Sequence, residues 1–388
     1  MTKACSFSDF TATASTQVAQ VAACATAVGE VTVHGDVLEA IDLTGLEAFY
    51  GSLSVKNATN AKSFVAPNLE LVSGSLVLDS NTILDTVNLA LLTTVGTLEF
   101  SALPHLESTG LTTGITSAEN ITISDTSFVN VNSINVFLLK IFNVNNNKDI
   151  ELIDSGIKKI TDTLSISSNS ENLDVSLDLL TTANQVYFES INSLSVANLT
   201  SVNDSLTFET TSLDKISILK LTNIGGSLTI DGNDNLEEVS LPQVTSVGGV
   251  LVVKDNLKLE SFEGLSKLKT VGGSATIDGA FNNVTFDALN RVSGAFNLTS
   301  TGDLSCSSFT KANKFTVEGN ESCSGAKDET FSSGTKSDTS SSTGSSSSTS
   351  GSSSSTSSSS KKSDGAAASV PRLTAFVTLM MGLGVALY

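Results

Sequence analysis

The chain has 388 residues, a formal net charge of −19, no Trp, three Tyr and two His. A nucleic-acid-binding protein needs a basic face for the phosphates, so this charge argues against that class. With only two His, the chain has few of the side chains that enzymes use most often for acid–base chemistry near neutral pH.

Residues 1–28 are expected to form an N-terminal cap. The stretch TATASTQVAQVAACATAV, residues 11–28, is rich in Ala and predicts a helix that lies over the first coil of the following domain. No apolar segment of the kind found in signal peptides comes after Met1, so we expect that the natural start is missing from this sequence.

Residues 29–325 repeat one unit at intervals of 20 to 24 residues, of which GSLTIDGNDNLEEVSLPQVTSVGG is an example. A period of this size predicts a solenoid, in which each coil buries its apolar side by stacking on its neighbours. Thirteen coils can be aligned, and they begin near Gly29, Gly51, Gly74, Gly96, Glu119, Lys140, Asp162, Asn184, Asp204, Gly226, Gly249, Gly273 and Gly294.

The third and fifth residues of every coil are apolar, which gives 26 inward-facing positions, such as Leu228 and Ile230. The residue between them points across the pleat and is mostly polar. The pattern predicts an all-β fold, a right-handed parallel β-helix or leucine-rich-repeat-like solenoid of about 13 coils, about 60 Å long at roughly 4.8 Å per rung. Asp and Asn after the strands are predicted turn residues whose side chains bond nearby backbone amides.

The stretch CSSFTKANKFTVEGNESC, residues 306–323, is expected to close the last coil. Because the two ends of such a rod lie tens of ångströms apart, only the pairs Cys5–Cys24 and Cys306–Cys323 can reach bonding distance. Disulfides of this kind indicate an oxidising compartment.

Seven N-x-Ser/Thr sequons lie in residues 1–325, which is about the number that chance predicts from the content of Asn, Ser and Thr. They permit N-glycosylation but do not by themselves indicate secretion. The candidate asparagines are Asn57, Asn120, Asn198, Asn203, Asn283, Asn297 and Asn320.

Residues 326–364 are dominated by Ser and Thr, a composition that cannot bury a core and predicts a disordered stalk. In residues 365–388, three small residues beginning at Gly365 precede a short spacer and a terminal apolar run, which matches a signal for glycosylphosphatidylinositol (GPI) attachment at Gly365. A transmembrane tail is the alternative, although the run of 16 residues is short for one. We therefore predict a cell-surface protein on the outer leaflet of the plasma membrane, in the cell wall, or in both.

Four features together carry a family resemblance: coils of the form GSLxI…L…V…LPxL…VGG, cysteine-bearing caps, the Ser-rich stalk and the Gly365 tail. In this combination the chain resembles the fungal family of GPI-anchored sporulation-specific and extracellular-mutant cell-wall proteins, whose core is similar to the receptor L domain. The resemblance covers essentially the whole chain. It implies a non-enzymatic surface glycoprotein required for cell-wall organisation and integrity, with wall polysaccharide or wall mannoproteins as partners.

A polysaccharide-processing enzyme is one alternative, because parallel β-helices include lyases and hydrolases of this kind. Glu189, Glu209 and Asp231 occupy the sixth position of three successive coils. Carboxylates about 5 Å apart would suit a retaining pair. We favour a solvated acidic column, and we predict no catalytic, cofactor-binding or metal-binding residue.

A ligand-binding ectodomain is the other alternative. The outward residues of the coils form a flat sheet face rich in Ser, Thr and Asn, which suits hydrogen bonding to glycan hydroxyls. Glycans on the sequons at Asn120 and Asn297 would mask the two ends of this face. The candidate binding face is therefore formed by Ser165, Tyr187, Thr207, Thr229, Val252 and Thr276.

Overall fold

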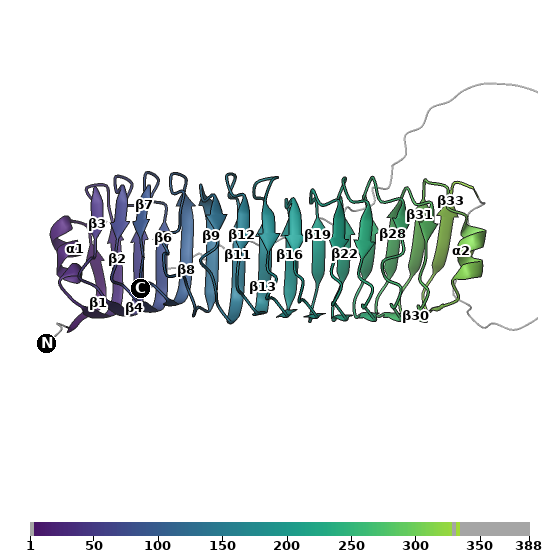
Figure 1. Cartoon of the computed structure of the whole chain (residues 1–388), viewed down its shortest axis with the longest axis horizontal. Coiled ribbons are helices and arrows are strands. Elements are labelled where there is room, and N and C mark those ends of the chain that lie inside the picture. Colours follow the sequence, from purple (N-terminus) through teal and green to yellow (C-terminus); the bar gives the residue numbers. More distant parts are fainter. Residues whose placement is uncertain (1–3, 328–330, 334–388) are drawn as a thin grey trace, which may run out of the picture. The chain divides into compact units, whose positions relative to one another are not determined.

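The structure is a computed structural model that describes residues 4–327 and 331–333. This part of the chain is wound into a parallel β-solenoid with a short helix at each end (Figure 1), so the predicted fold class is confirmed. The predicted GPI-attachment signal lies outside the described residues, as does nearly all of the predicted stalk.

The principal wall of the solenoid belongs to one sheet of 23 strands, in which successive coils pair in parallel. In the first half, each coil contributes one long strand: β1 (Ala4–Ala12), β2 (Thr26–His34), β4 (Ala48–Lys56), β6 (Leu71–Asp79), β8 (Thr94–Leu103), β9 (Asn120–Thr126), β11 (Leu138–Asn145) and β13 (Lys159–Ser167). In the second half, a corner divides each long strand into two: β15 (Thr182–Ala183) and β16 (Gln185–Glu189), β18 (Ser201–Val202) and β19 (Leu206–Glu209), β21 (Asn223–Ile224) and β22 (Leu228–Asp231), β24 (Ser246–Val247) and β25 (Leu251–Lys254), β27 (Thr270–Val271) and β28 (Ala275–Gly279), β30 (Arg291–Val292) and β31 (Phe296–Ser300), β32 (Thr316–Val317) and β33 (Glu321–Gly325).

Short strands form the opposite wall, which is divided into four separate parallel sheets. The first contains β3 (Ala40–Asp42), β5 (Ser63–Val65) and β7 (Thr86–Asn88), and the second contains β10 (Asn130–Val131), β12 (Leu152–Asp154), β14 (Asp174–Ser176) and β17 (Ser193–Ser195). The last two are β20 (Lys215–Ser217) with β23 (Glu238–Ser240) and β26 (Ser261–Phe262) with β29 (Asn283–Val284).

The predicted inward positions form the core. Each of the 26 side chains is at most 1% exposed, and residues stack on their equivalents in the next coil, as Leu206 does on Leu228. Burial of one such aliphatic side chain contributes roughly 1.5–3 kcal/mol. The strand register predicted from the alternating pattern is therefore confirmed.

Glycine begins many coils because the corner of the principal wall leaves no room for a side chain. Gly51 has φ of +140°, and a Cβ atom there would lie 1.9 Å from the carbonyl oxygen of Gly29 on the preceding coil. Only glycine adopts this conformation readily, so the repeated glycine marks the bend from one coil to the next.

The solenoid has about 15 turns rather than the 13 predicted. The two additional rungs come from the segments that were expected only to cap the rod. Strand β1 pairs in parallel with β2, and β33 pairs in parallel with β31. At roughly 4.8 Å per rung, the rod is about 70 Å long.

A column of buried asparagines follows the strands of the principal wall, at the place where turn residues were predicted. Their side chains reach across to the preceding coil. Asn147 Oδ1 accepts a hydrogen bond from the backbone N–H of Thr126 at 3.0 Å, and Asn147 Nδ2 donates to the carbonyl of Ile123 at 3.2 Å. The column consists of Asn81, Asn147, Asn169, Asn233 and Asn256.

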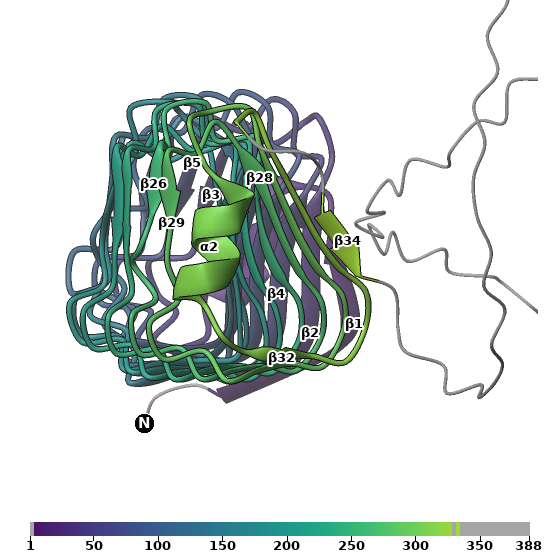
Figure 2. The same ribbon diagram turned by 90° about the vertical axis from the view of Figure 1, so that its right-hand side faces the viewer.

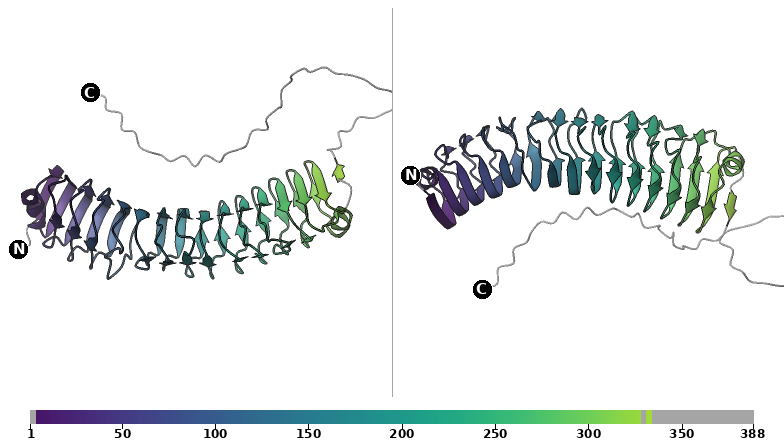
Figure 3. Two further views of the ribbon diagram at one scale, coloured as in Figure 1. Left: turned by 90° about the horizontal axis from the view of Figure 1, so that it is seen from above. Right: turned by 60° about the horizontal axis from the view of Figure 1, so that its bottom comes forward.

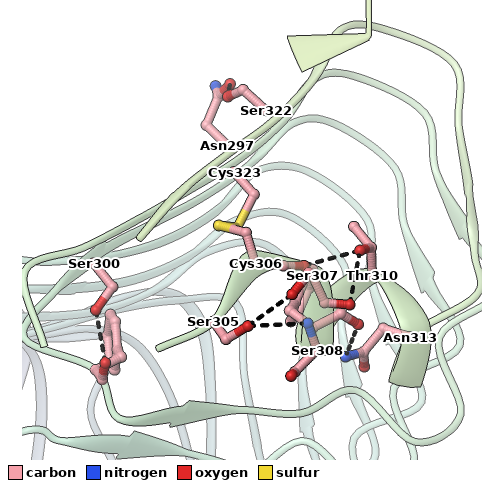
Figure 4. The surroundings of a disulfide bond; sticks show 12 residues. Asn297, Ser300, Ser305, Cys306, Ser307, Ser308, Thr310, Asn313, Ser322 and Cys323 are labelled. Carbon is pink, nitrogen blue, oxygen red and sulfur yellow. Dashed lines mark hydrogen bonds between the residues drawn. A yellow bond between two sulfur atoms is a disulfide. The ribbon is translucent and has the colours of Figure 1, made fainter. Parts of the chain in front are cut away.

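A helix and a disulfide close each end of the core. Helix α1 (Ser15–Ala22) lies within the predicted helical stretch but is shorter, because β1 and β2 occupy its flanks; helix α2 (Cys306–Ala312) covers the other end (Figure 2). Its first turn is capped by Ser305, whose Oγ accepts from the backbone N–H of Ser308 (Figure 4). Strand β34 (Phe331–Ser333) pairs antiparallel with β33.

The disulfides join Cys5 to Cys24 and Cys306 to Cys323, the two pairs expected from the sequence. They span 19 and 17 residues, and loops of this size contribute about 3 kcal/mol each in the chain-entropy model. The views in Figure 3 show that the capped solenoid curves gently along its length. In residues 4–327 and 331–333, no helix is long and apolar enough to cross a membrane.

Candidate functional site

The six residues of the predicted binding face lie side by side on the outside of the principal wall, and we call them the outer ladder. They belong to strands β13, β16, β19, β22, β25 and β28, and each is half-exposed. Direct strand pairing joins them in the order Ser165, Tyr187, Thr207, Thr229, Val252 and Thr276.

The hydroxyl groups of the outer ladder are available to a ligand. Within residues 4–327, the side chains of Ser165, Thr207, Thr229 and Thr276 form no hydrogen bond with the protein. Each hydroxyl can donate one hydrogen bond and accept two. The ladder therefore presents one free polar group on most rungs, at a spacing of about 4.8 Å.

Tyr187 is the single aromatic residue of the ladder, and it is held by the neighbouring acidic column. Its phenolic hydroxyl donates a hydrogen bond to Glu209 Oε2 at 3.2 Å. Burial raises the pKa of Tyr187, and the charges of Glu189 and Glu209 raise it further. The phenol therefore stays protonated at physiological pH and serves as a donor and as a ring surface, not as a base.

The acidic column runs beside the outer ladder, and strand pairing places Glu189, Glu209 and Asp231 on three successive rungs. Each carboxylate already has a partner. Ser168 Oγ donates to Glu189 Oε2 at 3.1 Å, Tyr187 holds Glu209, and Lys254 Nζ lies 2.8 Å from Asp231 Oδ2.

The Lys254–Asp231 pair lies on the same face of the sheet, because the two residues are direct partners across β22 and β25. Hydrogen bonding to Asp231 raises the pKa of Lys254. The pair neutralises the end of the acidic column nearest the C-terminus, so only Glu189 and Glu209 keep uncompensated charge there. Among the described residues, no group of three or more His, Cys, Asp or Glu side chains has the arrangement of a metal site.

The sequons are distributed around the rod. Asn57, Asn203, Asn283 and Asn320 are exposed, whereas Asn120, Asn198 and Asn297 are half-buried. Two of the half-buried asparagines lie on the principal wall: Asn120 Nδ2 donates to Thr97 Oγ1 at 3.2 Å, and Asn297 Oδ1 accepts from Ser322 Oγ at 2.8 Å. N-glycosylation of these residues stays a prediction.

The position of this surface was predicted from the sequence, but some of the contacts between its side chains were not. The pairing of Asp231 with Lys254 was foreseeable from their shared place in successive coils. The bond from Tyr187 to Glu209 was not, because it joins different columns of neighbouring rungs. The corner that precedes strands β15, β18, β21 and β24 also carries one threonine in each of four coils, which an alignment based on the strands alone does not reveal.

Known proteins similar to this chain are fungal surface proteins. The cell surface GPI-anchored protein ECM33 of Candida albicans is 35% identical over 319 residues, which cover 81% of this chain and 77% of that protein. Protein ecm33 of Aspergillus fumigatus is 30% identical, with 78% of this chain and 76% of that protein covered. The cell wall mannoprotein PST1 of Saccharomyces cerevisiae is 36% identical, with 73% and 64% covered.

No family model matches the chain, and no solved structure matches it. The similarity to the relatives nevertheless extends over most of the solenoid and over most of the two ECM33 proteins. The protein is accordingly located at the cell surface and in the cell wall. The chain belongs to the fungal family of GPI-anchored cell-surface and cell-wall proteins that includes ECM33 and PST1.

Proposed function

We propose that this protein is a non-enzymatic scaffold that is required for the organisation and integrity of the fungal cell wall. The observation that carries this proposal is the outer ladder, a continuous face with free hydroxyl groups on four of its six rungs. Such a face suits an extended contact with a wall component better than it suits the enclosure of a small substrate.

The state of the carboxylates favours a scaffold over a glycan-processing enzyme. A retaining glycosidase needs one carboxylate as nucleophile and the other as acid. Here Glu209 accepts a hydrogen bond from Tyr187, and Asp231 is paired with Lys254. The partners proposed for the outer ladder are wall polysaccharide or wall mannoproteins.

Anchoring forms part of the same proposal. We place the cap in residues 1–28, the solenoid in 29–325, the stalk in 326–364 and the GPI-attachment signal in 365–388. Gly365 receives the lipid, and the remainder of the signal is removed. Cells that express the protein with a functional signal peptide should release it on treatment with phosphatidylinositol-specific phospholipase C or wall glucanases. Resistance to both, with Tyr388 still present in the mature protein, would establish a transmembrane tail instead.

A complementation experiment tests the scaffold directly. In a strain that lacks the gene, we expect sensitivity to wall-binding dyes, and we expect Glu209→Gln to restore resistance as well as wild type does. Amide replacements keep size and hydrogen bonding but remove acid–base and nucleophilic chemistry. The double variant Thr207→Lys/Thr229→Lys should fail to restore resistance although it reaches the surface at normal abundance.

The opposite pattern would favour the enzyme. If Glu189→Gln and Glu209→Gln both fold and reach the surface but fail to restore resistance, the acidic column is catalytic and the scaffold proposal is wrong. If all variants restore resistance, the outer ladder is not the binding face.

A further inference from the structure

A second column of polar side chains runs along the corner that precedes strands β15, β18, β21 and β24. Four successive coils contribute one threonine each, and we call Thr181, Thr200, Thr222 and Thr245 the threonine column. The backbone N–H of each later threonine donates to the carbonyl of the one before it, at 2.9, 2.9 and 3.0 Å. The column lies on the side of the rod where β30 is labelled in Figure 1, which the right-hand view of Figure 3 brings forward.

The hydroxyl groups of this column are fixed in one orientation. Oγ1 of Thr200 and of Thr222 donates to the carbonyl of the preceding threonine, at 2.9 Å in both cases, and Thr245 does the same at 3.2 Å. Because a hydroxyl has only one hydrogen to donate, each oxygen keeps its lone pairs for an external donor. Thr200, Thr222 and Thr245 are exposed, so the column presents one oriented acceptor per rung.

Lysines close the column at both ends. The N–H of Thr181 donates to the carbonyl of Lys158 at 2.9 Å, and the N–H of Lys269 donates to the carbonyl of Thr245 at 2.9 Å. Lys158, Lys269 and the adjacent Lys159 are all exposed, and in the described part of the chain none of their ammonium groups forms an ion pair or a hydrogen bond. Five rungs separate the two ends, a distance of about 24 Å.

An exposed aromatic ring extends the column by one further coil. Phe137 is 59% exposed, and its carbonyl accepts from the N–H of Lys159 at 3.1 Å. Lys158 Nζ lies 5.4 Å from the centre of the Phe137 ring, within the range of a cation–π contact. A ring exposed in this way offers an apolar surface for the C–H face of a sugar.

The charge of this corner differs from that of the whole chain. The protein has a net charge of −19, yet the threonine column, taken together with Phe137 and the lysines at its ends, includes three cations and no carboxylate. Carboxylates within four residues of this set along the chain include Asp178, which accepts bonds from Ser195 Oγ and from the backbone N–H of Ala197, and Asp162 and Asp204, which follow Lys159 and Thr200. A negatively charged ligand is therefore attracted to this corner and repelled by the acidic column.

We propose that the threonine column binds an extended anionic glycan that runs along the rod, with its phosphate or carboxylate groups at Lys158, Lys159 and Lys269. Its hydroxyl groups donate to the oriented threonine oxygens, and one sugar packs on Phe137. This site is separate from the outer ladder and does not depend on the function proposed for that face.

A binding measurement with the full chain tests the proposal. The immobilised ligands are phosphorylated mannan, the same mannan after removal of phosphate, and polygalacturonate. The variant Lys158→Gln/Lys159→Gln/Lys269→Gln should bind the phosphorylated mannan about tenfold more weakly and lose most of the salt dependence. The matched control Lys148→Gln/Lys311→Gln/Lys314→Gln removes the same charge elsewhere and should bind like wild type. Polygalacturonate carries carboxylates and no phosphate, so its binding relative to that of phosphorylated mannan shows which anionic group the lysines prefer.

Thr222→Val tests the hydroxyl groups separately, since it keeps the β-branched shape and leaves the sequon Asn198-Leu199-Thr200 intact. It should weaken binding while the unfolding temperature stays close to that of wild type. Equal losses in the two lysine variants would overturn the proposal. So would equal binding of phosphorylated mannan, dephosphorylated mannan and polygalacturonate. The proposal would also be overturned if the lysine variant of the column or Thr222→Val left glycan binding unchanged and altered only the sedimentation of the free protein. The corner would then contact a second copy of the chain.

Discussion

Replacing Asn233 by Ala should destabilise the solenoid far more than an equivalent change two residues away. Asn233 Oδ1 accepts from the backbone N–H of Thr211 at 2.9 Å and from Thr211 Oγ1 at 2.6 Å, and Nδ2 donates to Asn256 Oδ1 at 3.0 Å. The alanine would leave buried polar groups of Thr211 without a partner. At about 1–3 kcal/mol for each of these two groups, we expect a loss of about 2–6 kcal/mol.

The matched control is Asn235→Ala, because Asn235 is exposed and, within residues 4–327, its side chain bonds only Lys258 Nζ, at 2.9 Å. This change should cost under about 0.5 kcal/mol. Urea unfolding followed by circular dichroism measures both, and hydrogen exchange at the amide of Thr211 reports the local effect directly. Equal destabilisation by the two variants, or unchanged protection at Thr211, would refute the view that the asparagine column holds neighbouring coils together.

Three further predictions concern the core, the surface ion pair and the cap. Leu228→Asp should cost several kcal/mol by burying an unpaired carboxylate, whereas Thr229→Asp on the wet face should cost under about 1 kcal/mol; similar urea midpoints would mean that the register is wrong. Because the pKa of Lys254 is raised above its ordinary value of 10.5, the stability that its pair supplies is present below that pH and lost as pH rises further. The stability difference between wild type and Lys254→Met should therefore close in strongly alkaline buffer, and a difference that persists there would count against the pair. Replacing Cys306 and Cys323 by Ser should lower stability by about 3 kcal/mol, and an unchanged unfolding temperature would show that the disulfide does not constrain the cap.

The core could be predicted from the sequence because its signal is local and repeated. Alternation of apolar and polar residues over three positions, as in Leu228-Thr229-Ile230, fixes which side chains face inward. Repetition in every coil then places Thr207 beside Thr229, so the outer ladder follows from the same alignment.

The rest of the structure depends on contacts that the repeat does not encode. Strands β1 and β33 add rungs although their segments lack the motif of the other coils, so the number of turns was predicted too low. The return side of each coil varies in length, and the stacking of Thr222 on Thr200 becomes visible only when those lengths are resolved in space. Burial of Asn233 was missed because a turn residue and a buried column of this kind look alike in the sequence.

Co-sedimentation of the full chain with isolated fungal cell walls tests the central claim most directly. Wild type and Glu209→Gln should pellet with the walls to the same extent and should release no soluble sugar from them. In a chain that also carries Lys158→Gln/Lys159→Gln/Lys269→Gln, so that the threonine column does not bind, Thr207→Lys/Thr229→Lys should stay in the supernatant with an unchanged circular dichroism spectrum. Release of soluble oligosaccharides by wild type that Glu209→Gln abolishes, with normal pelleting of the threonine variant, would contradict the scaffold and establish an enzyme.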